Sequence, residues 1–210
     1  HSFPTRRSSD LTMSAIPVFW QMPNRFLVGT AAAGGVALIL FATTAPQPAS
    51  RLAASDYIGL LLFYQQYAET LDTGDLADWP GFFTEDCLYQ VQPRENFDRN
   101  LPLATMSYES QGMLKDRVYC IRETLYYEPY YQRHVVGAPV VTEVQGDVVH
   151  AHASYAVFRT KPDATTAVYN VGRYMDEVVR QPQAALGWLL KSRRCVFDSD
   201  LILNSMIYPV

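Results

Sequence analysis

The stretch Val148–Asp198, VVHAHASYAVFRTKPDATTAVYNVGRYMDEVVRQPQAALGWLLKSRRCVFD, decides the fold. Apolar and polar residues alternate along it, and β-branched and aromatic side chains are frequent, which is typical of half-buried strands. Turn-forming residues divide it at Lys161-Pro162-Asp163 and at Gln181-Pro182-Gln183. The stretch therefore predicts three successive antiparallel strands, Val148–Arg159, Ala167–Val179 and Trp188–Asp198.

The residues before this stretch add two strands and two helices. Strands are predicted at Cys87–Gln92 and Val135–Val144, and a loop at Pro93–Pro102. A helix is expected from a Ser55/Asp56 cap to Asp72, and a second at Ser110–Leu125, where apolar residues form one stripe. Helices first and antiparallel strands later favour an α+β fold, with a strongly curved sheet wrapped around the N-terminal helices.

The N-terminal part differs in character from the rest. Residues 1–11, HSFPTRRSSDL, look like the translation of a high-throughput sequencing adapter, so we exclude them from the fold. Residues 12–54 form an extension containing the uncharged run Phe26–Ala45, which is long enough to span a bilayer. The run reads as a signal or anchor, or as upstream DNA translated in frame; we favour the second interpretation and expect no membrane contact. Residues 55–210 form the predicted domain.

Charge and cysteine content exclude several classes of protein. The chain has 210 residues and a net charge of −4, and residues 1–54 hold four of its 17 basic side chains but one of its 21 acidic ones. The predicted domain is therefore more acidic than the whole and would repel phosphate backbones, so nucleic acid is excluded as a partner. Three widely spaced cysteines, Cys87, Cys120 and Cys195, indicate reduced thiols in a cytoplasmic protein.

Few residues in the sequence suggest catalysis or metal binding. Phosphate-binding loops, nucleophile elbows and Cys-x-x-Cys pairs are absent from the sequence, and so are the Cys/His pairs of a Rieske cluster. His150 and His152 would share one face of a strand as two metal ligands do, but a metal site needs three or four, so we predict no metal in this chain.

A polar cluster of Asp116, Arg117, Arg133 and His134 allows two interpretations. A curved sheet could bring Asp116 to His134 as a general acid/base pair. Alternatively, the four residues form a structural network in which Arg133 and Asp116 pair and His134 caps buried polar groups; we favour this second interpretation.

Tyrosines carry two further predictions. In the enzyme alternative, Tyr108 or Tyr119 would serve as a proton donor. Tyr is enriched at protein interfaces because it combines a large apolar body with a polar tip. The cluster Tyr126, Tyr127, Tyr130 and Tyr131 could line a ligand pocket or a subunit interface, and we favour the interface.

Five separated motifs, in the same order, resemble the β subunits of aromatic-ring-hydroxylating dioxygenases, closest to the branch serving aromatic carboxylates such as terephthalate, salicylate or anthranilate. They are YQQYAETLDTGDLADWPGFFTEDCLYQV (Tyr64–Val91), QGMLKDRVYCIRE (Gln111–Glu123), RHVVG (Arg133–Gly137), GRYMDEV (Gly172–Val178) and KSRRCVFDSDLI (Lys191–Ile202). The resemblance implies a cystatin-like cone, the fold of nuclear-transport-factor-like proteins.

The resemblance also implies a role. It implies an assembly of three α and three β subunits, in which the α subunit carries a Rieske [2Fe–2S] cluster, a mononuclear Fe(II) and the substrate pocket, with electrons arriving from a reductase or ferredoxin. The β subunit is then structural, without catalytic residues or cofactors, in aromatic catabolism. Because the same cone hosts lyases, isomerases and hydrolases, a free-standing enzyme using Asp116 and His134 remains the alternative.

Overall fold

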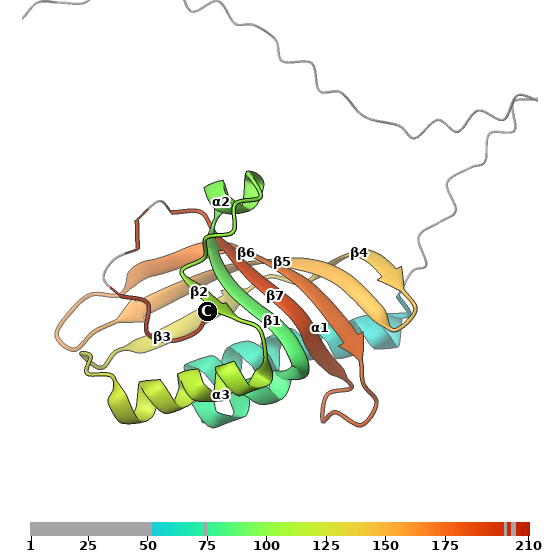
Figure 1. Cartoon of the computed structure of the whole chain (residues 1–210), viewed down its shortest axis with the longest axis horizontal. Helices are drawn as coiled ribbons and strands as arrows, with labels where there is room; N and C mark the ends of the chain where they lie inside the picture. The colour runs from blue at the N-terminus through green and yellow to red at the C-terminus, as the bar shows by residue number, and fades with distance from the viewer. Residues whose placement is uncertain (1–51, 74, 200, 203–204) are drawn as a thin grey trace, which may run out of the picture. The chain divides into compact units, whose positions relative to one another are not determined.

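The computed structural model describes residues 52–73, 75–199, 201–202 and 205–210, which belong to one compact unit (Figure 1). The predicted adapter at residues 1–11, the run Phe26–Ala45 and the rest of the extension up to residue 51 lie outside the described residues. In the described part of the chain, no helix is both long enough and apolar enough to cross a bilayer.

Helix α1, Ala54–Asp72, lies in the hollow of the sheet and buries one face, with Leu60, Phe63, Tyr64 and Tyr67 at helical spacing. The predicted Ser55/Asp56 cap is wrong. Ala53 precedes the first turn and makes no side-chain cap bond. The Asp56 carboxylate instead accepts two hydrogen bonds of 2.8 Å from the Arg180 guanidinium, an ion-pair partner that sequence spacing does not reveal.

The remaining helical elements are one that follows α1 and three that lie between strands. They are the 3₁₀ helix η1 (Leu76–Phe82), α2 (Arg94–Asp98), α3 (Gln111–Tyr119) and the π-helical turn η2 (Cys120–Thr124). The predicted helix Ser110–Leu125 corresponds to α3 and η2 together, and Ser110 caps it by accepting a 3.3 Å hydrogen bond from the Met113 N–H. The predicted loop Pro93–Pro102 is partly wrong, because α2 lies within it.

Seven strands form one mixed sheet in the order β2-β1-β7-β6-β5-β3, with β4 also paired to β5. The strands are β1 (Phe83–Pro93), β2 (Met106–Tyr108), β3 (Tyr131–Val136), β4 (Val140–Gln145), β5 (Val148–Thr160), β6 (Ala167–Arg180) and β7 (Trp188–Phe197). The pair β1/β7 is parallel and the other pairs are antiparallel. The predicted single strand Val135–Val144 is wrong: two strands, β3 and β4, flank an interruption at Gly137-Ala138-Pro139.

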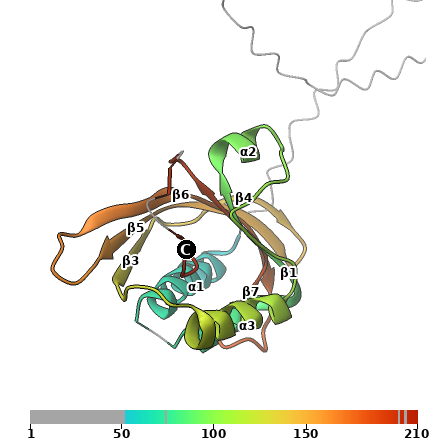
Figure 2. The ribbon, with the colours of Figure 1, turned by 60° about the vertical axis from the view of Figure 1, so that its left-hand side comes forward.

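The sheet curls around α1, and α3 lies across the open side, so that a view along the sheet shows a ring with α1 inside (Figure 2). The core is rich in aromatic side chains, including the buried Trp79, Phe83, Tyr89 and Tyr155. Cys87 and Cys195 are buried and Cys120 is half-buried, all three as free thiols. The predicted α+β class, with N-terminal helices in a curved mixed sheet, is confirmed.

Candidate functional site

The carboxylate beside His134 is Asp72, at the end of α1. His134 Nδ1 lies 2.6 Å from Asp72 Oδ1, and the His134 backbone N–H donates to Asp72 Oδ2 at 2.7 Å. Arg133 Nη1 lies 3.8 Å from the same carboxylate. Asp116 is exposed on α3. The predicted pairing of Asp116 with His134 and with Arg133 is therefore wrong. Asp72 takes the place of Asp116 because it ends a helix that packs on β3, whereas Asp116 points outward.

The His134–Asp72 pair is sealed from solvent. The His134 side chain is 0% exposed and the Asp72 side chain 3%. Within the described residues, His134 Nε2 is buried without a hydrogen-bond partner. A general base must reach the proton that it removes, directly or through one water. In this structure the pair joins the end of α1 to β3 and presents no nitrogen to a solute.

Arg117, predicted in the same cluster, has a separate role. Its Nη2 donates hydrogen bonds to the main-chain carbonyls of Met206 (3.1 Å) and Ile207 (2.6 Å). The two candidate proton donors also lie apart from His134 in their contacts: Tyr119 is exposed on α3, and the Tyr108 ring stacks on Tyr89 with centroids 6.1 Å apart. The predicted polar cluster is therefore not one site. Asp116 is exposed, Arg117 binds the main chain of Met206 and Ile207, and Arg133 and His134 lie at Asp72.

A buried ion pair lies inside the ring of strands and was not predicted. Arg193 on β7 donates from Nε and Nη2 to the two carboxylate oxygens of Asp176 on β6, at 3.0 and 2.7 Å. Both side chains are 0% exposed. The Tyr64 hydroxyl donates to the same carboxylate, and the guanidinium lies 4.1 Å from the Tyr67 ring centroid and 4.2 Å from that of Tyr174.

Asp176 and the surrounding aromatic rings compensate most of the buried Arg193 charge, although Arg193 Nη1 is buried without a hydrogen-bond partner among the described residues. Burial raises the pKa of the Tyr64 hydroxyl well above its ordinary value, and the adjacent Asp176 carboxylate adds to the effect, so Tyr64 remains a protonated donor. The sequence held one signal, since Arg193 alternates with Cys195 and Phe197 on the buried face of a strand. The register that places Asp176 opposite Arg193 depends on two strands and could not be read from either alone.

The histidines predicted to share a face do so. His150 and His152 are half-buried on β5 and alternate with the buried Val149, Ala151 and Ala153. With Glu177 and Arg194 they line a polar groove of 250 Å³ on the outer face of the sheet. Among the described residues, no three His, Cys, Asp or Glu side chains are grouped so as to hold a metal ion.

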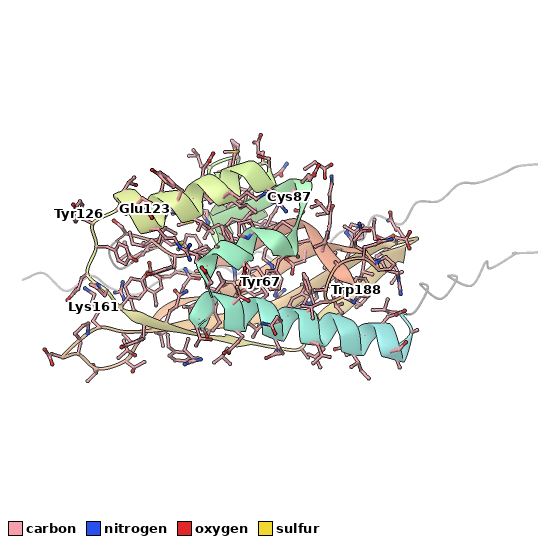
Figure 3. All side chains as sticks on the ribbon, turned by 90° about the horizontal axis from the view of Figure 1, so that it is seen from below. Tyr67, Cys87, Glu123, Tyr126, Lys161 and Trp188 are labelled. Carbon is pink, nitrogen blue, oxygen red and sulfur yellow. The ribbon has the colours of Figure 1, made fainter. Side chains whose placement is uncertain are left out.

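The predicted tyrosine cluster divides in two. Tyr126 is fully exposed, and Tyr131 is 80% exposed. Figure 3 shows Tyr126 at one end of the molecule, just past the helix that carries Glu123. Tyr127 and Tyr130 instead pack on Tyr208, with ring centroids 5.6 and 5.4 Å from it.

Next to Tyr131, apolar side chains continue across the outer face of the sheet. Val135 on β3, Ala156 on β5 and Val171 on β6 are direct cross-strand neighbours. Val168 lies opposite Phe158 on the same face. Val135, Val168 and Val171 are exposed, so the face offers an apolar surface in which Arg133 stands between Tyr131 and Val135. This surface, here called the outer patch, is defined by Tyr131, Val135, Ala156, Phe158, Val168 and Val171.

Comparison with known proteins agrees with this geometry. The family model of the ring hydroxylating β subunit matches residues 66–204. The small subunit of anthranilate 1,2-dioxygenase from Burkholderia cepacia is 32% identical over 152 residues, which cover 72% of this chain and 92% of that protein. Subunit β 2 of the terminal oxygenase component of terephthalate 1,2-dioxygenase from Comamonas sp. is 36% identical over 155 residues, covering 73% and 97%.

A solved structure supports the same assignment. A protein from Novosphingobium aromaticivorans, described as the β subunit of an aromatic-ring-hydroxylating dioxygenase, is 38% identical and superposes with a TM-score of 0.66 over 75% of this chain and 100% of that one. The resemblance inferred from the motifs is therefore confirmed. The chain belongs to the family of ring-hydroxylating dioxygenase β subunits.

Proposed function

We propose that this chain is an accessory, non-catalytic subunit that assembles with an iron-bearing α subunit into the terminal oxygenase of an aromatic-ring dioxygenase. The observation that carries the proposal is that the chain's own side chains and its segment Ser205–Val210 fill the interior of the cone. Its centre holds the buried Arg193–Asp176 ion pair, and the segment Ser205–Val210 lies across its mouth. The buried charges are thus paired with each other, and the histidine that could act as a base is 0% exposed.

The outer patch is the proposed contact with the α subunit. Apolar surfaces of this kind, with exposed aromatics and arginines, are typical of the buried centre of a subunit interface. Arg133 flanks Val135, and Arg173 flanks Val171; both are exposed. The patch therefore has a basic rim on an otherwise acidic chain, which suits an acidic α-subunit surface. Tyr126 lies at the end of the molecule and would extend the contact.

The finer features follow from the family. Three α and three β subunits would form the complex, and the Rieske [2Fe–2S] cluster and mononuclear Fe(II) would reside in the α subunits. Electrons would come from a reductase or ferredoxin, and the complex would act in the cytoplasm in aromatic catabolism. Anthranilate and terephthalate, named for the two relatives, suggest an aromatic carboxylate as substrate of the complex.

Co-expression with an iron-bearing α subunit of an aromatic-ring dioxygenase tests the proposal. We expect the two chains to co-purify, with iron stoichiometric to the α chain and ring hydroxylation only in the complex. Iron or turnover in the isolated chain would refute the proposal, and so would an α subunit that is fully active without it.

The variant His134→Ala separates the structural role from a catalytic one. Removing the imidazole leaves Asp72 buried without its partner, so we expect lower stability and a lower yield of complex. Turnover per assembled complex should stay within about twofold of the parent, whereas loss of a general base lowers rates by about 10²–10⁴. Iron-normalised turnover of purified complex distinguishes the two cases.

A further inference from the structure

The segment Ser205–Val210 enters the mouth of the cone, and Figure 2 marks the end of the chain inside the ring formed by the sheet, α1 and α3. Met206 and Val210 are buried, and Tyr208 is half-buried. The segment has an irregular backbone, so its main-chain polar groups need partners outside a helix or sheet ladder.

Side chains from separate elements bind consecutive carbonyls of this segment. The Tyr169 hydroxyl, on β6, donates to the Ser205 carbonyl at 3.1 Å. Arg117, on α3, donates to the next two carbonyls, those of Met206 and Ile207. One guanidinium therefore binds two successive main-chain carbonyls. Together with Tyr169, side chains bind three carbonyls in a row.

The far end of the segment meets a ring of donors. The Val210 main-chain oxygen accepts hydrogen bonds from the Tyr67 hydroxyl on α1 (3.3 Å), the Tyr89 hydroxyl on β1 (3.1 Å) and the Cys195 thiol on β7 (3.5 Å). The Val210 N–H donates to the Tyr89 hydroxyl at 3.0 Å. Side chains from three elements thus bind the main chain of one residue.

The donors in this ring keep their protons. Burial raises the pKa of the Cys195 thiol to about 12, and it also raises the pKa values of Tyr67 and Tyr89. The Arg193 cation lies against the Tyr67 ring and adds positive potential. A buried site made of protonated donors beside a cation is complementary to an oxygen that only accepts hydrogen bonds, such as the main-chain oxygen of Val210.

We propose that the mouth of the cone is a peptide-binding site whose ligand is an extended segment of the sequence Ser-Met-Ile-Tyr-Pro-Val, and that this chain fills the site in cis. Main-chain hydrogen bonds provide affinity in peptide recognition, and side-chain pockets provide specificity. The specificity element here is Tyr208, whose hydroxyl bonds that of Tyr127 and whose ring meets the Tyr127 and Tyr130 rings edge-on.

Cleaving the chain just before the segment Ser205–Val210 tests this proposal, because the segment starts out bound in its site. A specific protease recognition sequence is inserted into the full chain after the exposed Ser199, and the purified protein is cut. We expect the cut segment to stay bound through gel filtration and to exchange with a fluorescein-labelled Ser-Met-Ile-Tyr-Pro-Val peptide. Binding should be saturable, with a dissociation constant in the micromolar range or tighter, and an unlabelled peptide should compete.

Variants on one helix provide the matched comparison. Arg117→Gln should weaken peptide binding about tenfold or more, because charged hydrogen bonds to two carbonyls are lost. Lys115→Gln, which removes an exposed charge from the same helix, should leave the affinity unchanged. A peptide with Phe in place of Tyr208 should bind more weakly. Unfolding on cutting, release of the segment without rebinding, or equal affinity in Arg117→Gln and Lys115→Gln would each overturn the proposal.

Discussion

Asp176 and Arg193 form a fully buried ion pair, and each depends on the other for compensation. Removing one charge from such a pair typically lowers stability by about 3–5 kcal/mol, because the remaining charge is buried without a partner. We therefore expect Asp176→Asn to lower the free energy of unfolding in urea by about that amount. Asp86→Asn is the control: its Lys191 partner lies at the surface, so the midpoint should not move measurably. Equal effects of the two substitutions would contradict the assignment.

The raised pKa of the Cys195 thiol predicts that the folded chain loses stability at alkaline pH. Its pKa is about 12 in the folded chain and about 9 ordinarily, so above about pH 9 the unfolded chain releases this proton while the folded chain keeps it. The contribution of this thiol to stability is fully present below pH 9 and is lost as the pH rises towards 12. We expect Cys195→Ser, which keeps a donor for the Val210 main-chain oxygen, to flatten part of this decline. Urea midpoints at about pH 8 and about pH 10.5 measure it; an unchanged slope would show that Cys195 does not contribute.

The sequence points to His134 but not to its partner. His134 follows Arg133 at the entry to a predicted strand, and the sequence suggests Asp116 as its carboxylate. The carboxylate found there, Asp72, ends the first helix, and its packing against β3 is a long-range contact that no local pattern encodes. The same limit hid the Arg193–Asp176 pair, whose meeting depends on strand register.

Strands β5, β6 and β7 were predicted almost to the residue, because alternation and proline-containing turns are local signals. The break between β3 and β4 was missed, because Val135–Val144 keeps its apolar character across Gly137-Ala138-Pro139. The parallel pairing of β1 with β7 also lay beyond local pattern, because it joins strands from opposite ends of the domain.

Gly172 on β6 lies tightly against the backbone of β7. A Cβ at this position would collide with the Val196 carbonyl oxygen and lie 2.8 Å from the Phe197 Cα. Both neighbours are backbone atoms of a paired strand and cannot turn aside, so Gly172→Ala should lower stability by about 1–3 kcal/mol or more. Gly81→Ala, at a site with no atom within 4 Å of the new Cβ, is the control. The thermal unfolding midpoints of the two variants test this expectation. Equal midpoints would contradict the close packing at Gly172.

The outer patch, the surface proposed to meet the α subunit, predicts a separation of folding from assembly. Val171→Glu places a carboxylate at the centre of the patch without disturbing the core, because Val171 is exposed. We expect a folded chain that no longer co-purifies with the α subunit. Leu62→Glu on α1, a similarly exposed apolar position away from the patch, should assemble normally. If both variants assemble equally well, the interface lies elsewhere.

The parallel pair β1/β7 bears on how the molecule is made. Tyr89 on β1 pairs with Arg193 on β7, so the sheet cannot be completed until nearly the whole domain has left the ribosome. Until then, β1 has the short β2 as its paired neighbour and otherwise exposes an edge. Pairings so distant in sequence form slowly and leave nascent chains prone to aggregation. Slower translation would prolong that exposed state, and a high yield of this subunit would depend on chaperones that shield the β1 edge until β7 arrives.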